Sequence, residues 1–102
     1  MNKQIMEMIS YSNDGILSKK VVKQSNLDVD LFSMAAGTEI GNHTAKKDAF
    51  VYVIEGQGTF ILNGEEINMM PGTFIKMNKD EVHSLKAKEN MSFLLTLVGE
   101  EK

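Results

Sequence analysis

The sequence predicts an all-β protein that folds as a sandwich or a barrel of short strands. Three observations lead to this prediction: turn signals recur along the chain, the segments between them are short and rich in β-branched and aromatic residues, and 102 residues suit one domain. Many short strands at a spacing of about 8–12 residues are typical of a sandwich or a barrel. We therefore expect a single domain over residues 1–102, with an N-terminal segment at 1–15 and a barrel at about 16–98.

The elements follow from the turn signals in chain order. The N-terminal segment allows only a short helix, at Gln4–Ser10. Asn63-Gly64 is the strongest turn signal, because both residues tolerate positive φ and the pair favours a tight hairpin. The predicted strands are Ile16–Gln24, Val29–Met34, Glu39–Gly41, Ala49–Glu55, Thr59–Leu62, Glu65–Met69, Thr73–Lys76, Val82–Ala87 and Ser92–Val98.

One predicted strand is apolar on both of its faces. Along Ala49–Ile54, residues 49, 51 and 53 point one way and residues 50, 52 and 54 point the other. A strand with two apolar faces is typically covered on both sides. We expect one face to line the barrel interior and the other to pack against a second sheet or a partner chain.

Composition argues against several classes of protein. The net charge is -3, whereas nucleic-acid binding needs a basic face and an anionic membrane surface attracts basic segments. The chain has no cysteine, which excludes disulfides, thiolate zinc sites and cysteine nucleophiles. The longest apolar run, Ala49–Ile54, is far too short to span a bilayer. We expect a cytoplasmic protein that binds neither nucleic acid nor membranes.

Two stretches of the chain resemble the two sequence motifs of the cupin superfamily. Gly37–Gly58 is similar to the first motif, in which a glycine precedes His-x-His, a glutamate and a second glycine. Pro71–His83 is similar to the second motif, in which Pro-x-Gly precedes a histidine, although Asn78 and Asp80 stand in place of that proline and glycine. The resemblance covers residues 37–87 and implies a small single-domain cupin with a double-stranded β-helix barrel.

The resemblance also implies a reduced metal site. Many cupins hold a divalent metal inside the barrel with three histidines and one glutamate, and by position these ligands fall on His43, Ala45, Ala49 and His83. Two imidazoles therefore remain, and open catalytic zinc sites usually have three protein ligands. The nearest carboxylate in sequence is Asp48, which strand alternation turns outward if Ala49 points inward. The cofactor is thus unknown, with a weakly bound divalent metal ion at His43 and His83 as the candidate.

The sequence leaves several functions open. In the first, the barrel binds a small molecule, and His43 and His83 serve as hydrogen-bonding or proton-transfer groups in a metal-free reaction of the isomerase or epimerase type. In the second, the protein is a divalent-metal-binding cupin enzyme of the dioxygenase or isomerase type. In the third, it is a non-catalytic dimeric binding or regulatory module. The same histidines are also compatible with ordinary hydrogen-bonded core residues.

Strand alternation predicts the residues that line the pocket. It assigns Ala45, Ala49, Val51 and Val53 to the interior together with His43, and it places Leu85 on the same face as His83. This set predicts an apolar pocket with the two imidazoles as its polar groups.

We also expect a homodimer. The strand Ile16–Gln24 would be an exposed edge in a monomer, and edge strands are usually blunted or paired. Cyclic dimers are the commonest soluble oligomers. A two-fold partner would cover Val21, Met34, Phe50 and Tyr52.

Overall fold

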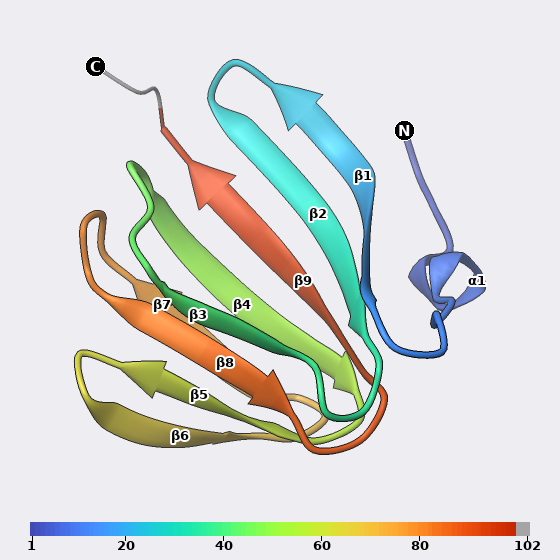
Figure 1. The fold of residues 1–102 in the computed structure, drawn as a ribbon. Coiled ribbons are helices and arrows are strands. Elements are labelled where there is room, and N and C mark those ends of the chain that lie inside the picture. The colour runs from blue at the N-terminus through green and yellow to red at the C-terminus, as the bar shows by residue number, and fades with distance from the viewer. Residues whose placement is uncertain (100–102) are drawn as a thin grey trace.

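The computed structural model describes residues 1–99 and has two antiparallel sheets that face each other (Figure 1). The five-stranded sheet has the order β1-β2-β9-β4-β7 and the four-stranded sheet the order β3-β8-β5-β6. The strands are β1 (Ile16–Gln24), β2 (Leu27–Met34), β3 (Glu39–His43), β4 (Asp48–Glu55), β5 (Gly58–Leu62), β6 (Glu65–Met69), β7 (Phe74–Met77), β8 (His83–Ala87) and β9 (Met91–Val98). The prediction of an all-β, two-sheet barrel is confirmed.

The turns lie where the sequence signals place them. Asn63 and Gly64 have φ values of 50° and 87°, and they join β5 to β6 in the predicted tight hairpin. Gly56 follows β4 with a φ of 87°, and a Cβ at this position would collide with the backbone at Asn90. Glycine is required there because it tolerates both the positive φ and the close approach of the second chain segment.

Some strand boundaries differ from the prediction. The strand predicted at Glu39–Gly41 continues to His43, so the histidine lies within β3 and not in the loop after it. β2 begins at Leu27, because Gln24 pairs directly with Leu27 across a short turn. The strand boundaries differ because they are determined by hydrogen bonding to the partner strands. This pairing outweighs the turn preference of the local sequence.

The N-terminal segment lies beside the edge strand β1 (Figure 1). Its helix α1 (Ile5–Met8) is shorter than the predicted Gln4–Ser10, and residues 1–99 contain no helix long and apolar enough to cross a bilayer. Lys19 Nζ donates a hydrogen bond to the Met8 carbonyl at 2.7 Å, and Lys3 Nζ donates to the Lys20 carbonyl at 3.5 Å. This segment therefore protects part of the β1 edge within a single chain.

A polar network fixes the end of the N-terminal segment on the five-stranded sheet. The Tyr11 hydroxyl donates to Glu55 Oε2 at 2.7 Å and lies 2.7 Å from Ser92 Oγ, which is itself 3.0 Å from Ser33 Oγ. Burial is the main reason that the pKa of Tyr11 rises to about 12. Ser33 and Ser92 are buried and form hydrogen bonds, as buried polar groups must.

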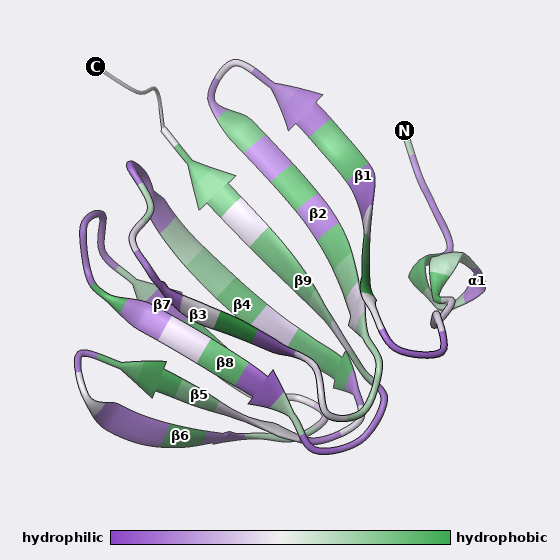
Figure 2. Ribbon diagram, viewed as in Figure 1, coloured by the Kyte–Doolittle hydropathy of each residue, from purple (hydrophilic) through white to green (hydrophobic). Residues whose placement is uncertain are grey.

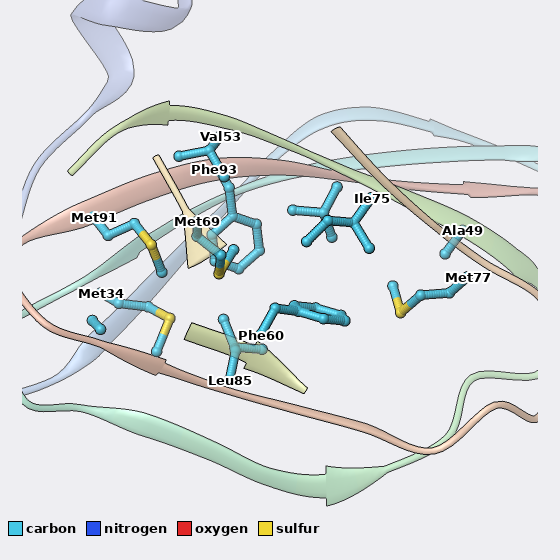
Figure 3. Packing of buried hydrophobic residues seen from close by; sticks show 12 residues of the cluster. Met34, Ala49, Val53, Phe60, Met69, Ile75, Met77, Leu85, Met91 and Phe93 are labelled. Atoms are coloured by element: carbon cyan, nitrogen blue, oxygen red, sulfur yellow. The ribbon is translucent and has the colours of Figure 1, made fainter. Parts of the chain in front are cut away.

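The core fills the space between the two sheets. Figure 3 shows Phe60 and Leu85 from the four-stranded sheet facing side chains such as Ile75 and Phe93 from the five-stranded sheet. As Figure 2 shows, β4 is hydrophobic along most of its length. Its residues Ala49, Val51 and Val53 are buried, as alternation predicts, so the assignment of this face to the interior is confirmed.

The other face of β4 is only partly covered within one chain. Tyr52 is 45% exposed and its neighbour on β7, Phe74, is 60% exposed, while the Phe50 and Phe74 rings stack at 5.4 Å. Met34 does not belong to this outer surface, contrary to the expectation, because its side chain is fully buried in the core. Exposed aromatic side chains that gather on one face are typical of an interaction surface.

We predict that the protein forms a homodimer through the outer face of β4 and β7, because pairing removes the Tyr52 and Phe74 side chains from water. Light scattering at micromolar concentration should give about twice the monomer mass. A Phe74→Asp substitution places charge in the interface and should shift the equilibrium towards the monomer. A wild-type protein that remains monomeric at this concentration would contradict the prediction.

Candidate functional site

The pairing of β3 with β8 brings the two histidines together. His43 and His83 are direct partners across the two strands, and their ring centroids lie 4.0 Å apart at an interplanar angle of 63°. The two histidines are 40 residues apart in the sequence, and the pairing of strands in the sheet, rather than a local turn, brings them together. The predicted pair of imidazoles therefore exists as one spatial cluster.

A bulge in β3 determines the direction in which His43 points. Ile40 pairs with Leu85 and His43 pairs with His83, so three residue steps on β3 match two on β8. In a regular strand, two residues three positions apart, such as Ile40 and His43, would lie on opposite faces. Because a bulge inserts one residue and restores the direction of the side chains, both residues line the interior.

The two histidines are among the residues that line an apolar cavity of about 180 Å³. Its walls come from both sheets and include three phenylalanine rings. The lining residues are Phe32, Ile40, His43, Val51, Phe60, Met77, His83, Leu85, Phe93 and Leu95. His43 is exposed and His83 is only 5% exposed, which places His43 at the mouth of the cavity and His83 inside it.

Backbone hydrogen bonds select the tautomer of each imidazole. His43 Nδ1 lies 2.9 Å from the Gly41 carbonyl, and His83 Nδ1 lies 3.2 Å from the Glu81 carbonyl. A carbonyl oxygen only accepts, so each Nδ1 carries the proton and each neutral ring has its lone pair on Nε2. Within residues 1–99, neither Nε2 has a hydrogen-bond partner. The cavity thus contains two hydrogen-bond acceptors that a ligand can use.

The surroundings of His83 keep its imidazole neutral. Burial lowers the pKa of His83 from its ordinary value of 6.5, because the charged form loses hydration. The hydrogen bond to the Glu81 carbonyl opposes this shift, whereas the positive charge that His43 can carry lowers the pKa further. The Phe60 ring lies nearly parallel to His83, with a centroid distance of 5.8 Å, and contributes to the apolar environment.

Two of the five predicted pocket residues line the cavity. Val51 and Leu85 do so, whereas Ala45, Ala49 and Val53 are not among the lining residues. Ala49 and Val53 are fully buried in the core, on the same face as Val51 but to either side of the cavity. Ala45 lies in the loop between β3 and β4, where strand alternation does not determine the direction of a side chain.

The donor set does not fit a resident divalent metal ion. Residues 1–99 contain no group of three or more His, Cys, Asp or Glu side chains placed to hold a metal. The carboxylate of Asp48 accepts a hydrogen bond from the Lys79 backbone N–H at 2.9 Å and thus holds the loop after β7. Two imidazoles alone fall short of the three protein ligands that open zinc sites usually have.

Sequence reasoning missed the aromatic walls of the cavity. Phe32 on β2 pairs with Phe93 on β9, and their rings stack at 5.3 Å with an interplanar angle of 2°. Phe60 reaches the cavity from β5 on the opposite sheet. Alternation within each strand shows which residues share a face of the sheet. It does not show which of them line the cavity unless the pairing of the strands is also known.

The comparisons with known proteins agree with this architecture. A conserved protein of unknown function from Streptococcus pyogenes has a TM-score of 0.88 at 27% identity, with 100% of this chain and 90% of that chain covered. KdgF from Halomonas sp. has a TM-score of 0.78 at 24% identity, covering 86% of this chain and 81% of KdgF. No protein of curated function matches the sequence significantly.

A dioxygenase also shares the fold. Salicylate 1,2-dioxygenase from Pseudoaminobacter salicylatoxidans has a TM-score of 0.77 at 20% identity, and the match covers 82% of this chain but 25% of the dioxygenase. At this level of identity the likeness shows the fold alone, because one fold supports many functions. The profile of the Cupin domain family matches residues 30–99. The chain therefore belongs to the cupin family.

Proposed function

We propose that this cupin binds a small molecule in the cavity beside His43 and His83, with the imidazoles acting as neutral hydrogen-bond acceptors. The observation that supports this most directly is the pair of Nδ1–carbonyl bonds, which leaves both Nε2 atoms free in an otherwise apolar cavity. Ligand sites are typically apolar concavities with a few convergent polar groups. The access at His43 and the buried end at His83 fit such a site.

The same arrangement is suited to proton transfer. A neutral imidazole with a lowered pKa acts as a general base when its free nitrogen reaches an acidic proton of the ligand. For a carbonyl compound with a nearby carbon–carbon double bond, Nε2 of one histidine would remove a proton from the carbon between the two double bonds, and the resulting imidazolium would return it to the far carbon of the carbon–carbon double bond. This balanced step is an isomerisation. An epimerisation would use both imidazoles, because one removes the proton and the other, in its protonated form, returns a proton to the opposite face of the same carbon.

A non-catalytic binding module differs from this proposal only in the absence of turnover. The apolar cavity and the exposed aromatic surface of β4 and β7 serve a dimeric binding protein equally well. The two functions share the prediction that the histidines contact the ligand, and a binding experiment therefore tests the common part.

The first test is a binding experiment with a mixed panel of small alcohols, phenols, amides, aldehydes and carboxylates. We predict that at least one member shifts the NMR signals of the cavity residues, and that His43→Ala and His83→Phe each weaken its binding severalfold. Loss of one hydrogen bond corresponds to about a 2- to 12-fold change. Ser84→Ala is the matched control, because Ser84 is next to His83 on β8 but is absent from the cavity lining.

Two results would contradict the proposal. One is a panel in which no compound perturbs the cavity. The other is a ligand that binds to both histidine variants as tightly as it binds to the wild type and the Ser84→Ala control.

The lowered pKa of His83 predicts a pH-dependent stability. Because the folded pKa lies below the ordinary 6.5, the unfolded chain binds more protons than the folded chain at pH values between the two. The stabilising contribution is present above about pH 6.5 and is lost as the pH falls through this window. Urea unfolding near pH 7.5 and near pH 5 should show a larger loss of stability in the wild type than in His83→Phe. Equal losses would refute the prediction.

A further prediction concerns the two alanines at the ligand positions that the family implies. The double substitution Ala45→His with Ala49→Glu restores an imidazole and a carboxylate beside β3 and β4, and it should increase the affinity for zinc relative to the wild type. Titration calorimetry of protein purified without a metal-affinity tag measures this. A folded double mutant with no gain in affinity would show that these positions do not converge on the histidines.

A further inference from the structure

We propose that the ligand of this cavity is a small, neutral, hydroxylated aromatic ring of the phenol class, whose hydroxyl donates to an imidazole Nε2. This inference rests on the binding part of the proposed function, and not on its proton-transfer step, and adds the chemical class of the ligand. Four properties of the cavity lead to it: its size, its aromatic walls, its acceptor groups and the lack of charge in its lining.

The size of the cavity corresponds to a single ring. Its volume is about 180 Å³. An engineered apolar cavity of about 150 Å³ in another protein accommodates benzene. The cavity of this cupin therefore has room for one six-membered ring with a small substituent.

The walls of the cavity favour an aromatic ligand. The rings of Phe32 and Phe93 stack on each other on the five-stranded sheet, and Phe60 lines the cavity from the four-stranded sheet. Aromatic pairs gain about 0.5–1.5 kcal/mol beyond the burial of area, a difference of about 2- to 12-fold in affinity. The thioether of Met77 adds a polarizable contact of the kind that aromatic rings accept. An aromatic ring therefore fits better than a saturated ring of similar volume.

The polar end of the cavity requires a donor from the ligand. His83 uses its Nδ1 proton for the Glu81 carbonyl, and His43 uses its Nδ1 proton for the Gly41 carbonyl. Each Nε2 can then only accept a hydrogen bond while the ring is neutral. A hydroxyl group supplies the complementary donor, whereas a ketone or an ether oxygen does not.

The absence of charge in the lining favours a neutral ligand. Among the described residues, those that line the cavity include no Lys, Arg, Asp or Glu. A carboxylate or an ammonium group would lose its hydration there without a countercharge, and that loss is costly. A phenol is neutral near pH 7, since the phenolic group of tyrosine has a pKa of about 10.

The test compares four probes that differ by one property each. Phenol, toluene, benzoate and cyclohexanol are titrated into the isotope-labelled wild-type protein, and affinities are taken from the shifts of the His83 and Phe60 signals. We expect phenol to bind about 2- to 12-fold more tightly than toluene, which lacks the donor, and than cyclohexanol, which lacks the aromatic ring. We expect benzoate, which carries a charge, to be more than about tenfold weaker than phenol.

A variant of His83 tests whether its imidazole causes the preference for phenol over toluene. His83→Phe keeps an aromatic ring against Phe60 but removes Nε2, so the advantage of phenol over toluene should fall while toluene still binds. Continued binding of toluene shows that the variant has kept its cavity. Ser84→Ala, on the same strand, should retain the full preference for phenol. If His83→Phe does not fold, His43→Ala provides the same comparison at the exposed mouth of the cavity.

The outcomes separate this inference from the proposed function. If benzoate or cyclohexanol binds as tightly as phenol, or if toluene equals phenol, the ligand class is wrong while binding at the cavity stands. If none of the four probes shifts the cavity signals, the inference is also wrong. The proposed function then fails as well only if the mixed panel leaves the cavity unperturbed.

Discussion

The extra residue in β3 is the constraint on which the candidate site depends. On β8, Leu85 and His83 are two positions apart and point to the same side of the sheet. Their partners on β3, Ile40 and His43, are three positions apart, and the extra residue lets both of them point to that side as well. In a regular strand the two imidazoles would lie on opposite faces, and the cavity would lose its polar mouth. The bulge thus brings together two histidines that are distant in sequence, with a distance of 4.0 Å between their ring centroids.

Ala45 and Ala49 stand at the positions where the resemblance to the cupin motifs implies metal ligands. With Ala45 in a loop and Ala49 buried among apolar side chains, the two imidazoles receive no third ligand from β4. Each ring is instead held by a backbone carbonyl that selects the Nδ1–H tautomer. In this tautomer the Nε2 atom of each ring is a hydrogen-bond acceptor in an apolar cavity, a setting suited to hydrogen bonding and proton transfer. Burial lowers the pKa of His83 and thereby favours the neutral form of its ring.

Local patterns in the sequence predict much of the fold and less of the site. The turn at Asn63-Gly64 and the alternation of Ala49, Val51 and Val53 depend on neighbouring residues, and the structure confirms both. The stacking of Phe32 on Phe93 depends on the pairing of β2 with β9, which no local pattern reveals. The bulge in β3 is likewise visible only from its partner strand. The histidines were found because the cupin motifs carry long-range information that alternation alone does not contain.

The protonation of the imidazole nitrogens is the most direct test of this account. Two-bond proton–nitrogen correlation spectra of the isotope-labelled protein near pH 7 distinguish a protonated ring nitrogen from one that carries a lone pair. The account predicts that His83 is neutral, with the proton on Nδ1 and the lone pair on Nε2. A charged His83 ring, or a proton on Nε2, would remove the acceptor from the buried end of the cavity and contradict the account.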